Sequence, residues 1–130
     1  MLKFTLAIAT DDGQCLIKRH FGDSDFYYIY DVGEAGAKLL QKIPNTVDEE
    51  EEIHADPQKA KGIAQILKKE GVDVLASKAF GPNIKRMIKK FACVMLKTES
   101  LEAALELILI HKETIKKELD KGENRIPLKF

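Results

Sequence analysis

The sequence predicts an α/β fold with a mixed five-stranded sheet and helices on both faces. The first third of the chain has short apolar or β-branched runs separated by turn residues, and the remainder alternates helical and strand-like segments. Short connections among the first three strands favour antiparallel neighbours, whereas strand–helix–strand alternation favours parallel ones. We therefore expect the strand order 3-2-1-4-5, with strand 2 opposed to the rest.

The first three strands are expected at residues 4–10, 15–19 and 26–32. The first is apolar and partly β-branched, which suits a central strand covered on both faces. Residues 38–43 either extend a strand or form an irregular edge. The acidic run 48–52 is typical of a solvated loop, and we assign it no chemistry.

Helices and strands alternate in the rest of the chain. The first helix begins at Asp56-Pro57, ends before Gly71, and turns four apolar residues to the core: Ala60, Ile63, Ala64 and Leu67. A strand follows at 72–77. The second helix opens at Gly81-Pro82-Asn83 and buries Ile84, Met87, Ile88 and Phe91.

The last strand is expected at 92–96 and precedes a long third helix. This helix starts near Thr98 or Ser100 and continues to Leu119, where Gly122 ends it. Its inward positions are Leu101, Ala104, Leu105, Ile108 and Ile115.

Length and composition indicate a single domain with a substantial core. Residues 1–110 form its body, and 111–130 add a helical extension with a tail, 123–130, that we expect to be loosely attached. Ile126, Pro127, Leu128 and Phe130 are the tail residues able to dock. The 21 basic and 21 acidic residues balance, which argues against nucleic-acid or membrane partners. Two cysteines form no disulfide framework, so we expect a cytoplasmic protein.

The most informative motif is His20-Phe21-Gly22, in a short turn between two predicted strands. Neutral imidazole is a good ligand for iron, and a glycine allows close approach of a ligand to the backbone. This turn therefore suits a protein that holds a ligand. The alternative is a turn histidine bonded only to backbone.

Three further features are weighed beside it. Cys15 is a second candidate metal ligand, although a lone strand cysteine is more often a core residue, as we expect for Cys93. The Gly81-Pro82-Asn83 helix start suits an anion or is simply a helix start. A basic helix face attracts an acidic partner or cluster, or is merely solvated: Lys85, Arg86, Lys89 and Lys90. His54 and His111 lack the spacing of a zinc site.

The ordered set of these motifs resembles the dinitrogenase iron–molybdenum cofactor-binding family over about residues 1–110. The matching segments are Ile8-Ala9-Thr10, His20-Phe21-Gly22, Gly71-Val72-Asp73-Val74-Leu75 and Gly81-Pro82-Asn83. The resemblance implies a ribonuclease-H-like fold and non-enzymatic binding of an iron–sulfur or iron–molybdenum-type cluster as transient cargo. It also implies protein partners in cofactor assembly or delivery.

The resemblance carries over His20 as the ligand and the Gly81 segment as a wall of the same end of the sheet. The chain departs from the family at residues 76–80, which are bulkier than the small stretch expected and argue against a large cluster. The C-terminal extension is not explained by the family.

Two other functions compete with cluster carriage. A regulatory or interaction module, with a homodimer as one form of it, would bind no cluster. A metal-dependent nuclease would need several converging carboxylates, and residues 4–10 contain none. No nucleophile–base pair or phosphate-loop motif is present, so we expect no enzyme activity.

Overall fold

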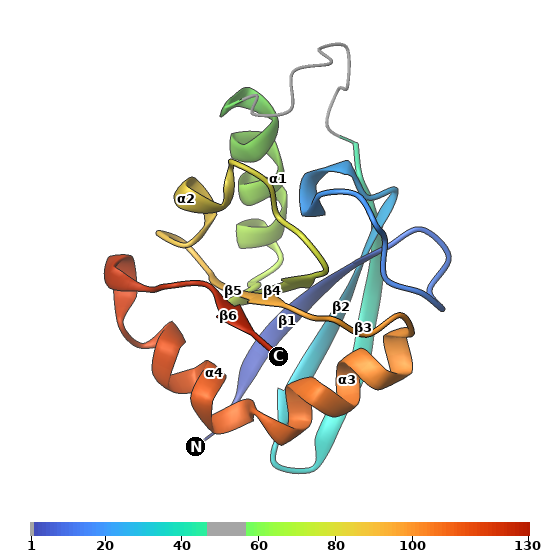
Figure 1. The fold of residues 1–130 in the computed structure, drawn as a ribbon, viewed down its shortest axis with the longest axis vertical. Coiled ribbons are helices and arrows are strands. Elements are labelled where there is room, and N and C mark those ends of the chain that lie inside the picture. Colours follow the sequence, from blue (N-terminus) through green and yellow to red (C-terminus); the bar gives the residue numbers. More distant parts are fainter. Residues whose placement is uncertain (1, 47–56) are drawn as a thin grey trace.

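The computed structural model describes residues 2–46 and 57–130, and these form three layers (Figure 1). A six-stranded mixed sheet has the order β3-β2-β1-β4-β5-β6. Its strands are β1 (Phe4–Thr10), β2 (Phe26–Gly33), β3 (Gly36–Pro44), β4 (Val74–Ser77), β5 (Ala92–Met95) and β6 (Leu128–Lys129). The helices are α1 (Pro57–Lys69), α2 (Ile84–Met87), α3 (Leu101–Ile110) and α4 (Lys112–Leu119), with short 3-10 turns η1 (Phe21–Asp23) and η2 (Gly122–Asn124).

The helices lie on both faces of the sheet, as predicted (Figure 1). Strand β1 shows how the sequence builds both faces. Its Ala7 and Ala9 belong to the core cluster under α1 and α2, whereas Leu6 and Ile8 belong to the cluster under α3 and α4. Because successive side chains of a strand point to opposite faces, one apolar run supplies both cores.

The predicted order and directions of the first five strands are confirmed. The residues that form the second and third strands differ from those predicted. Strand β2 is antiparallel to β1 and β3, and β4 is parallel to β1 and β5. Residues 15–19, predicted as the second strand, form a loop with one isolated bridge, from Cys15 to Ser100. The prediction failed because Leu16 and Ile17 are buried in opposite clusters, an alternation that a strand also shows.

The predicted third strand is therefore β2, the neighbour of β1. The segment predicted as a strand or an irregular edge is the edge strand β3. It pairs with β2 along its length, with a register shift between Ile29 and Tyr30. Such a bulge bends an edge strand away from regular pairing.

The three predicted helices are found, but the second has only four residues, with the buried Phe91 beyond its end, and the third is divided. Ile63, Ala64 and Leu67 of α1 are buried, while Asp56 and the Ala60 side chain fall outside the described part, as do His54 and the acidic run 48–52. In α2 only Met87 is fully buried, and Ile84 and Ile88 pack partly against the same core. The single long third helix is two, because His111 leaves helical geometry at φ −103°, ψ 18°.

The C-terminal tail is not loosely attached. Leu128 and Lys129 form β6, a sixth strand parallel to β5, and Phe130 N donates to Met95 O at 2.9 Å. His111 stacks on Phe130 with ring centroids 3.9 Å apart. Glu118 accepts from Ile126 N at 3.0 Å, and Arg125 Nη1 donates to Ile88 O at 2.9 Å. A short segment with scattered apolar residues gave no strand signal, yet it is held by specific contacts of Arg125, Ile126 and residues 128–130.

None of the helices in the described ranges is long and apolar enough to cross a membrane.

Candidate functional site

The candidate site lies where β1 and β4 end, between two loops that the strands bring together. His20 forms an isolated parallel bridge with Ala79, and Phe21 N donates to Ala79 O at 2.8 Å. Parallel neighbouring strands end at the same edge of a sheet, so the segments after β1 and β4 meet there. The predicted proximity of the His20 turn and the Gly81 segment is thus realised in the structure.

Phe21 anchors the turn from inside the core. Its side chain is 0% exposed and packs against Tyr27 and Phe80, with ring centroids at 4.8 and 5.3 Å. Tyr27 Oη donates to Phe21 O at 2.8 Å. The His20-Phe21-Gly22 turn, with Phe21 in it, is predicted to bind the cofactor, but the Phe21 ring is buried and its contribution is to fix the turn.

The same packing answers the question raised by the bulky segment 76–80. Ala76 and Ser77 are fully buried, and Phe80 is 2% exposed, so the large ring points into the core. Lys78 and Ala79 are half-buried. The extra bulk therefore fills the interior under α1 and α2 and does not fill the edge beside His20.

Gly81 lies against the imidazole of His20. Its φ is +72°, and a Cβ built there would come within 2.4 Å of His20 Nδ1. Neither the left-handed backbone nor that contact is open to a residue with a side chain. The structure thus gives a physical reason for glycine at position 81, and His20 itself is half-buried.

The remaining residues of the two predicted binding segments are Gly22, Pro82 and Asn83. Gly22 O accepts from Asn45 Nδ2 at 3.0 Å, which ties the turn to the end of β3. Pro82 is exposed, and Asn83 is 8% exposed with its Oδ1 accepting from Arg86 Nη1 at 3.1 Å. Since α2 has only four residues, we assign no anion site to its start.

Cys15 is exposed but lies on the other side of the sheet edge from His20. Its bridge to Ser100 places it at the start of α3, whereas His20 contacts the segment that leads to α2. Leu16 and Ile17, packed in opposite clusters, mark where the loop crosses from one side to the other. No three His, Cys, Asp or Glu side chains within the described ranges form a metal-binding group.

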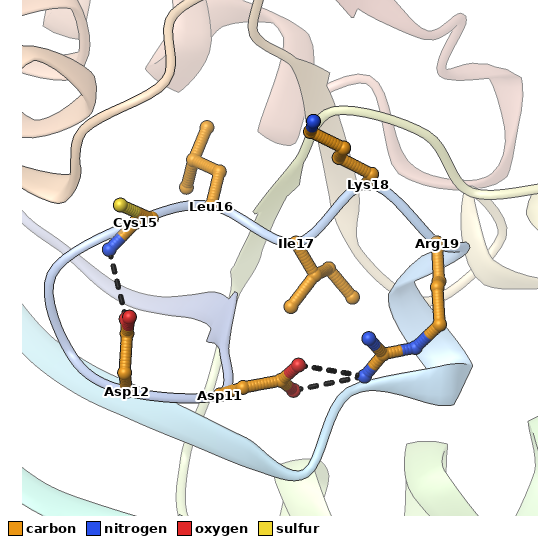
Figure 2. A pocket seen from close by; sticks show the side chains of 7 residues that line it. All are labelled: Asp11, Asp12, Cys15, Leu16, Ile17, Lys18 and Arg19. Carbon is orange, nitrogen blue, oxygen red and sulfur yellow. Dashed lines mark hydrogen bonds and ion pairs between the residues drawn. The ribbon is translucent and has the colours of Figure 1, made fainter.

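The loop from Asp11 to Arg19 encloses a shallow hollow of about 220 Å³ (Figure 2). Asp12 Oδ1 accepts from Gln14 N at 2.8 Å and Cys15 N at 2.9 Å, and these bonds lower the pKa of Asp12. Arg19 Nη2 lies 2.9 Å from both carboxylate oxygens of Asp11, a contact that raises the pKa of Arg19. Both carboxylates are thus used in holding the loop, and the hollow is not arranged as a hard-cation site.

Positive charge is concentrated near this end, on α2 and in the turn that follows it. Lys78 pairs with Glu99, and the ammonium lowers the pKa of that carboxyl, with a further contribution from Lys18. The four cations predicted as a basic face are exposed and have no ion pair with another described residue: Lys85, Arg86, Lys89 and Lys90. Sequence spacing revealed this face, but it gave no sign of the Lys78–Glu99 pair, whose members come from different loops.

A family model described as dinitrogenase iron-molybdenum cofactor matches residues 3–109. The chain belongs to this family. The predicted resemblance is therefore confirmed, and residues 110–130, which supply α4, η2 and β6, lie beyond the match.

Two solved structures share the fold. A crystal structure from Methanocaldococcus jannaschii, provisionally titled a dinitrogenase, is 21% identical with a TM-score of 0.63, covering 86% of this chain and 93% of that one. An NMR structure from Thermotoga, provisionally titled a NifB protein, is 17% identical with a TM-score of 0.59, covering 84% and 90%. No curated protein matches.

Sequence reasoning missed the backbone contact of Ala79 with the His20 turn. Every residue has a carbonyl group, so no side chain marks this contact in the sequence. The contact between Gly81 and His20 had one sequence signal, an isolated glycine after a buried strand, which marks close approach without naming the neighbour.

Proposed function

We propose that this chain carries an iron–sulfur or iron–molybdenum-type cluster, or its precursor, as transient cargo and catalyses no reaction on it. Membership of the dinitrogenase iron–molybdenum cofactor family supports this at the level of cargo class. The observation that points to a particular ligand is the position of His20, which lies on a fixed turn against Gly81 at the edge of the sheet. An imidazole nitrogen is a suitable terminal ligand for iron.

A small ligand set fits handover better than permanent storage. Cys15, our second predicted ligand, is bridged through its backbone to Ser100 at the start of α3, so His20 is the single side chain that we assign to the cluster. Clusters held permanently usually have four protein ligands. With one protein ligand, most coordination positions of the cargo stay open to a receiving protein.

The protein acts in the cytoplasm beside proteins that assemble or receive the cluster, and its sheet is of the ribonuclease-H-like type. The exposed cations on α2 and in the turn after it offer an acidic partner a contact surface. Alternatively, the partner is a second copy of this chain.

Anaerobic reconstitution with ferrous iron and sulfide tests the proposal. Bound iron and visible absorption are compared among wild type, His20→Ala and His111→Ala. The last is the control, since His111 stacks on Phe130 in the C-terminal extension. We expect stoichiometric uptake in wild type and the control, and loss of uptake in His20→Ala.

Uptake that persists in His20→Ala would remove His20 as the ligand, and Cys15→Ser would then be tested. A folded wild type that takes up no iron would contradict cluster carriage. The interaction module without a cluster, favoured by the exposed cations of α2 and the turn after it, would then be the better account.

A further inference from the structure

Three cations from distant parts of the chain meet around the turn that follows α2. Lys68, near the end of α1, places its Nζ 4.6 Å from the centroid of the Phe91 ring, and Phe91 directly follows Lys90. Arg125, from the C-terminal tail, donates from Nη1 to Ile88 O at 2.9 Å in the same turn (Figure 1). Lys68, Lys90 and Arg125 are referred to together as the cation cluster.

The guanidinium of Arg125 is held in place by two backbone carbonyls from different segments. Nε donates to Leu119 O at 3.0 Å at the end of α4, and Nη1 donates to Ile88 O. The remaining nitrogen, Nη2, makes no hydrogen bond to a described residue. A fixed guanidinium with an unused nitrogen is ready to donate to an added acceptor, since Arg matches carboxylate geometry well.

The carboxylates near the cation cluster are engaged elsewhere. Asp73 Oδ2 accepts from Thr5 N at 3.1 Å. Glu118 accepts from Ile126 N and from Lys121 Nζ, both at 3.0 Å. None of the three cations forms an ion pair with another residue in the ranges 2–46 and 57–130. Positive charge is therefore in excess around this turn.

The three charges also act on one another. The pKa of Lys68 is lowered, first by its partial burial, and the charges of Arg125 and Lys90 lower it further against the opposing effect of Asp73. Like charges held close together repel and destabilise the fold. A bound anion would relieve this repulsion.

We propose that the cation cluster, completed by Arg125 of the C-terminal extension, is a docking site for an acidic segment of a partner protein. Cations from three segments of this chain complement carboxylates spaced along another chain, and such complementarity favours association and fixes its orientation. Arg125 lies beyond the family match, which ends at residue 109. The extension thus gains a role in recognition. The inference rests on the proposed function only in taking the partner to be a protein that exchanges the cargo.

A nucleic acid suits the cation cluster less well. Proteins that bind single strands offer exposed aromatic rings on which bases stack, whereas the Phe91 ring beneath Lys68 is 0% exposed. The balance of 21 basic and 21 acidic residues also gives the whole chain no net attraction for phosphates.

The first test needs no partner. In Arg125→Gln, the pKa of the Lys68 ammonium, measured by NMR, is expected to rise because a neighbouring positive charge is removed. Lys38→Gln is the control, since Lys38 is exposed on β3 at the opposite edge of the sheet from the tail. An unchanged Lys68 pKa in folded Arg125→Gln would show that the two charges do not face a common region, and would overturn the inference.

The second test measures binding of a fluorescein-labelled oligoglutamate by fluorescence anisotropy. Lys68→Gln, Lys90→Gln, Arg125→Gln and the control Lys38→Gln each remove one positive charge, so their net charges are equal. We expect the first three to raise the dissociation constant about 2–5-fold each, the range that an exposed ion pair supports, and the control to bind like wild type. Equal weakening in the control would mean that binding follows net charge alone and would overturn the site.

The remaining outcomes also decide. Should Arg125→Gln not fold, a shift of the Arg125 Hε resonance on adding the oligoglutamate to wild type would support its role, and no shift would exclude it. A DNA duplex that binds more tightly than the oligoglutamate, with the same dependence on the cluster, would overturn a protein as the partner. No oligoglutamate binding by folded wild type would overturn the inference. Because the assay contains no iron, that result would leave cluster carriage to the test of iron uptake.

Discussion

Ser77 carries a buried hydroxyl at the end of β4. Its Oγ has no hydrogen-bond partner among the described residues, and the side chain is 0% exposed. A buried polar group without a partner destabilises a protein by about 1–3 kcal/mol. We expect Ser77→Ala to unfold at the same or a higher urea concentration than wild type, with a gain of up to about 1 kcal/mol.

Thr10→Val is the matched control for Ser77→Ala. Thr10 Oγ1 donates to Cys15 O at 2.7 Å and accepts from Gly13 N at 2.9 Å, so removing this satisfied hydroxyl should lower stability by about 1–3 kcal/mol. A clear loss of stability in Ser77→Ala would show that its hydroxyl has a partner in solution.

The carboxylate of Asp12 should make the stability of its loop depend on pH. Hydrogen bonds from Cys15 N and Gln14 N lower its pKa in the folded protein below the ordinary 3.8. A lowered pKa stabilises the folded loop above pH 3.8, and this contribution disappears as the pH falls through the folded value. We expect the Gln14 and Cys15 amides to lose protection from hydrogen exchange over this window.

Asp12→Asn tests the charge while keeping an acceptor oxygen. The protection factors of its loop amides, which compare each exchange rate with that of an unstructured peptide at the same pH, should depend little on pH between about 2 and 5, a range that brackets the ordinary pKa of 3.8. An unchanged pH profile in the variant would exclude Asp12 as the titrating group.

At the scale of whole elements, α4 and the tail are joined through Glu118. Its carboxylate accepts from Ile126 N and from Lys121 Nζ, both at 3.0 Å, and the side chain is 5% exposed. Burial raises the pKa of Glu118, but these hydrogen bonds outweigh it and the net pKa lies below 4.5. The carboxylate therefore stabilises the docked tail above pH 4.5, and this is lost as the pH falls through the folded value.

Glu118→Ala should lower the free energy of unfolding by about 1.5–3 kcal/mol, because it removes hydrogen bonds to a charged, buried group. The amides of Ile126 and Phe130 should exchange faster. Glu123→Ala, at an exposed position, is the control and should change stability little. Equal effects of the two substitutions would show that the Glu118 contacts do not hold the tail.

Sequence reasoning succeeded for elements whose own pattern defines them. The buried strand 4–10, the capped helix near Ser100 and the glycine stop at Gly71 depend on local signals, and Ser100 Oγ does accept from Ala103 N at 3.0 Å. Sequence reasoning failed for segments whose structure depends on contacts with residues far away in the sequence. Residues 15–19 alternate in burial because the loop crosses the end of the sheet, and β6 forms because β5 offers an open edge.

For the site, the sequence predicted which segments meet but not how they touch. His20 and Gly81 were assigned to one end of the sheet, and the structure places them in contact. The inward position of Phe21 and the separation of Cys15 depend on which face each loop residue packs against. A turn without regular periodicity does not encode that choice locally.

At the scale of the whole molecule, charge is unevenly distributed although the total is balanced. Between residues 57 and 97 only Glu70 and Asp73 are acidic, whereas lysines and arginines recur throughout. Lys68 lies over the Phe91 ring at 4.6 Å, and its pKa is lowered, first by burial and then by the charges of Arg125 and Lys90. The α1–α2 layer is thus the basic side of a neutral protein.

The layout also predicts that stability and cargo binding can be separated. The site lies at the ends of β1 and β4, whereas the tail docks on β5 at the opposite edge of the sheet from β3. Deleting residues 126–130 removes β6, the His111–Phe130 stack and the bond from Lys97 N to Phe130 O. Removing the partly buried Leu128 and Phe130 should lower the free energy of unfolding by about 2–4 kcal/mol, since full burial of each would contribute about 1.5–3 kcal/mol.

Iron uptake per folded molecule should stay at the wild-type level in this deletion variant, because no contact between His20 and Gly81 depends on β6. Urea unfolding and anaerobic reconstitution at a temperature where the variant is fully folded measure the two quantities on one sample. Reduced uptake by the folded variant would contradict this independence. The extension beyond residue 109 would then be coupled to the His20 turn through β5 and β4, the strands that lie between them.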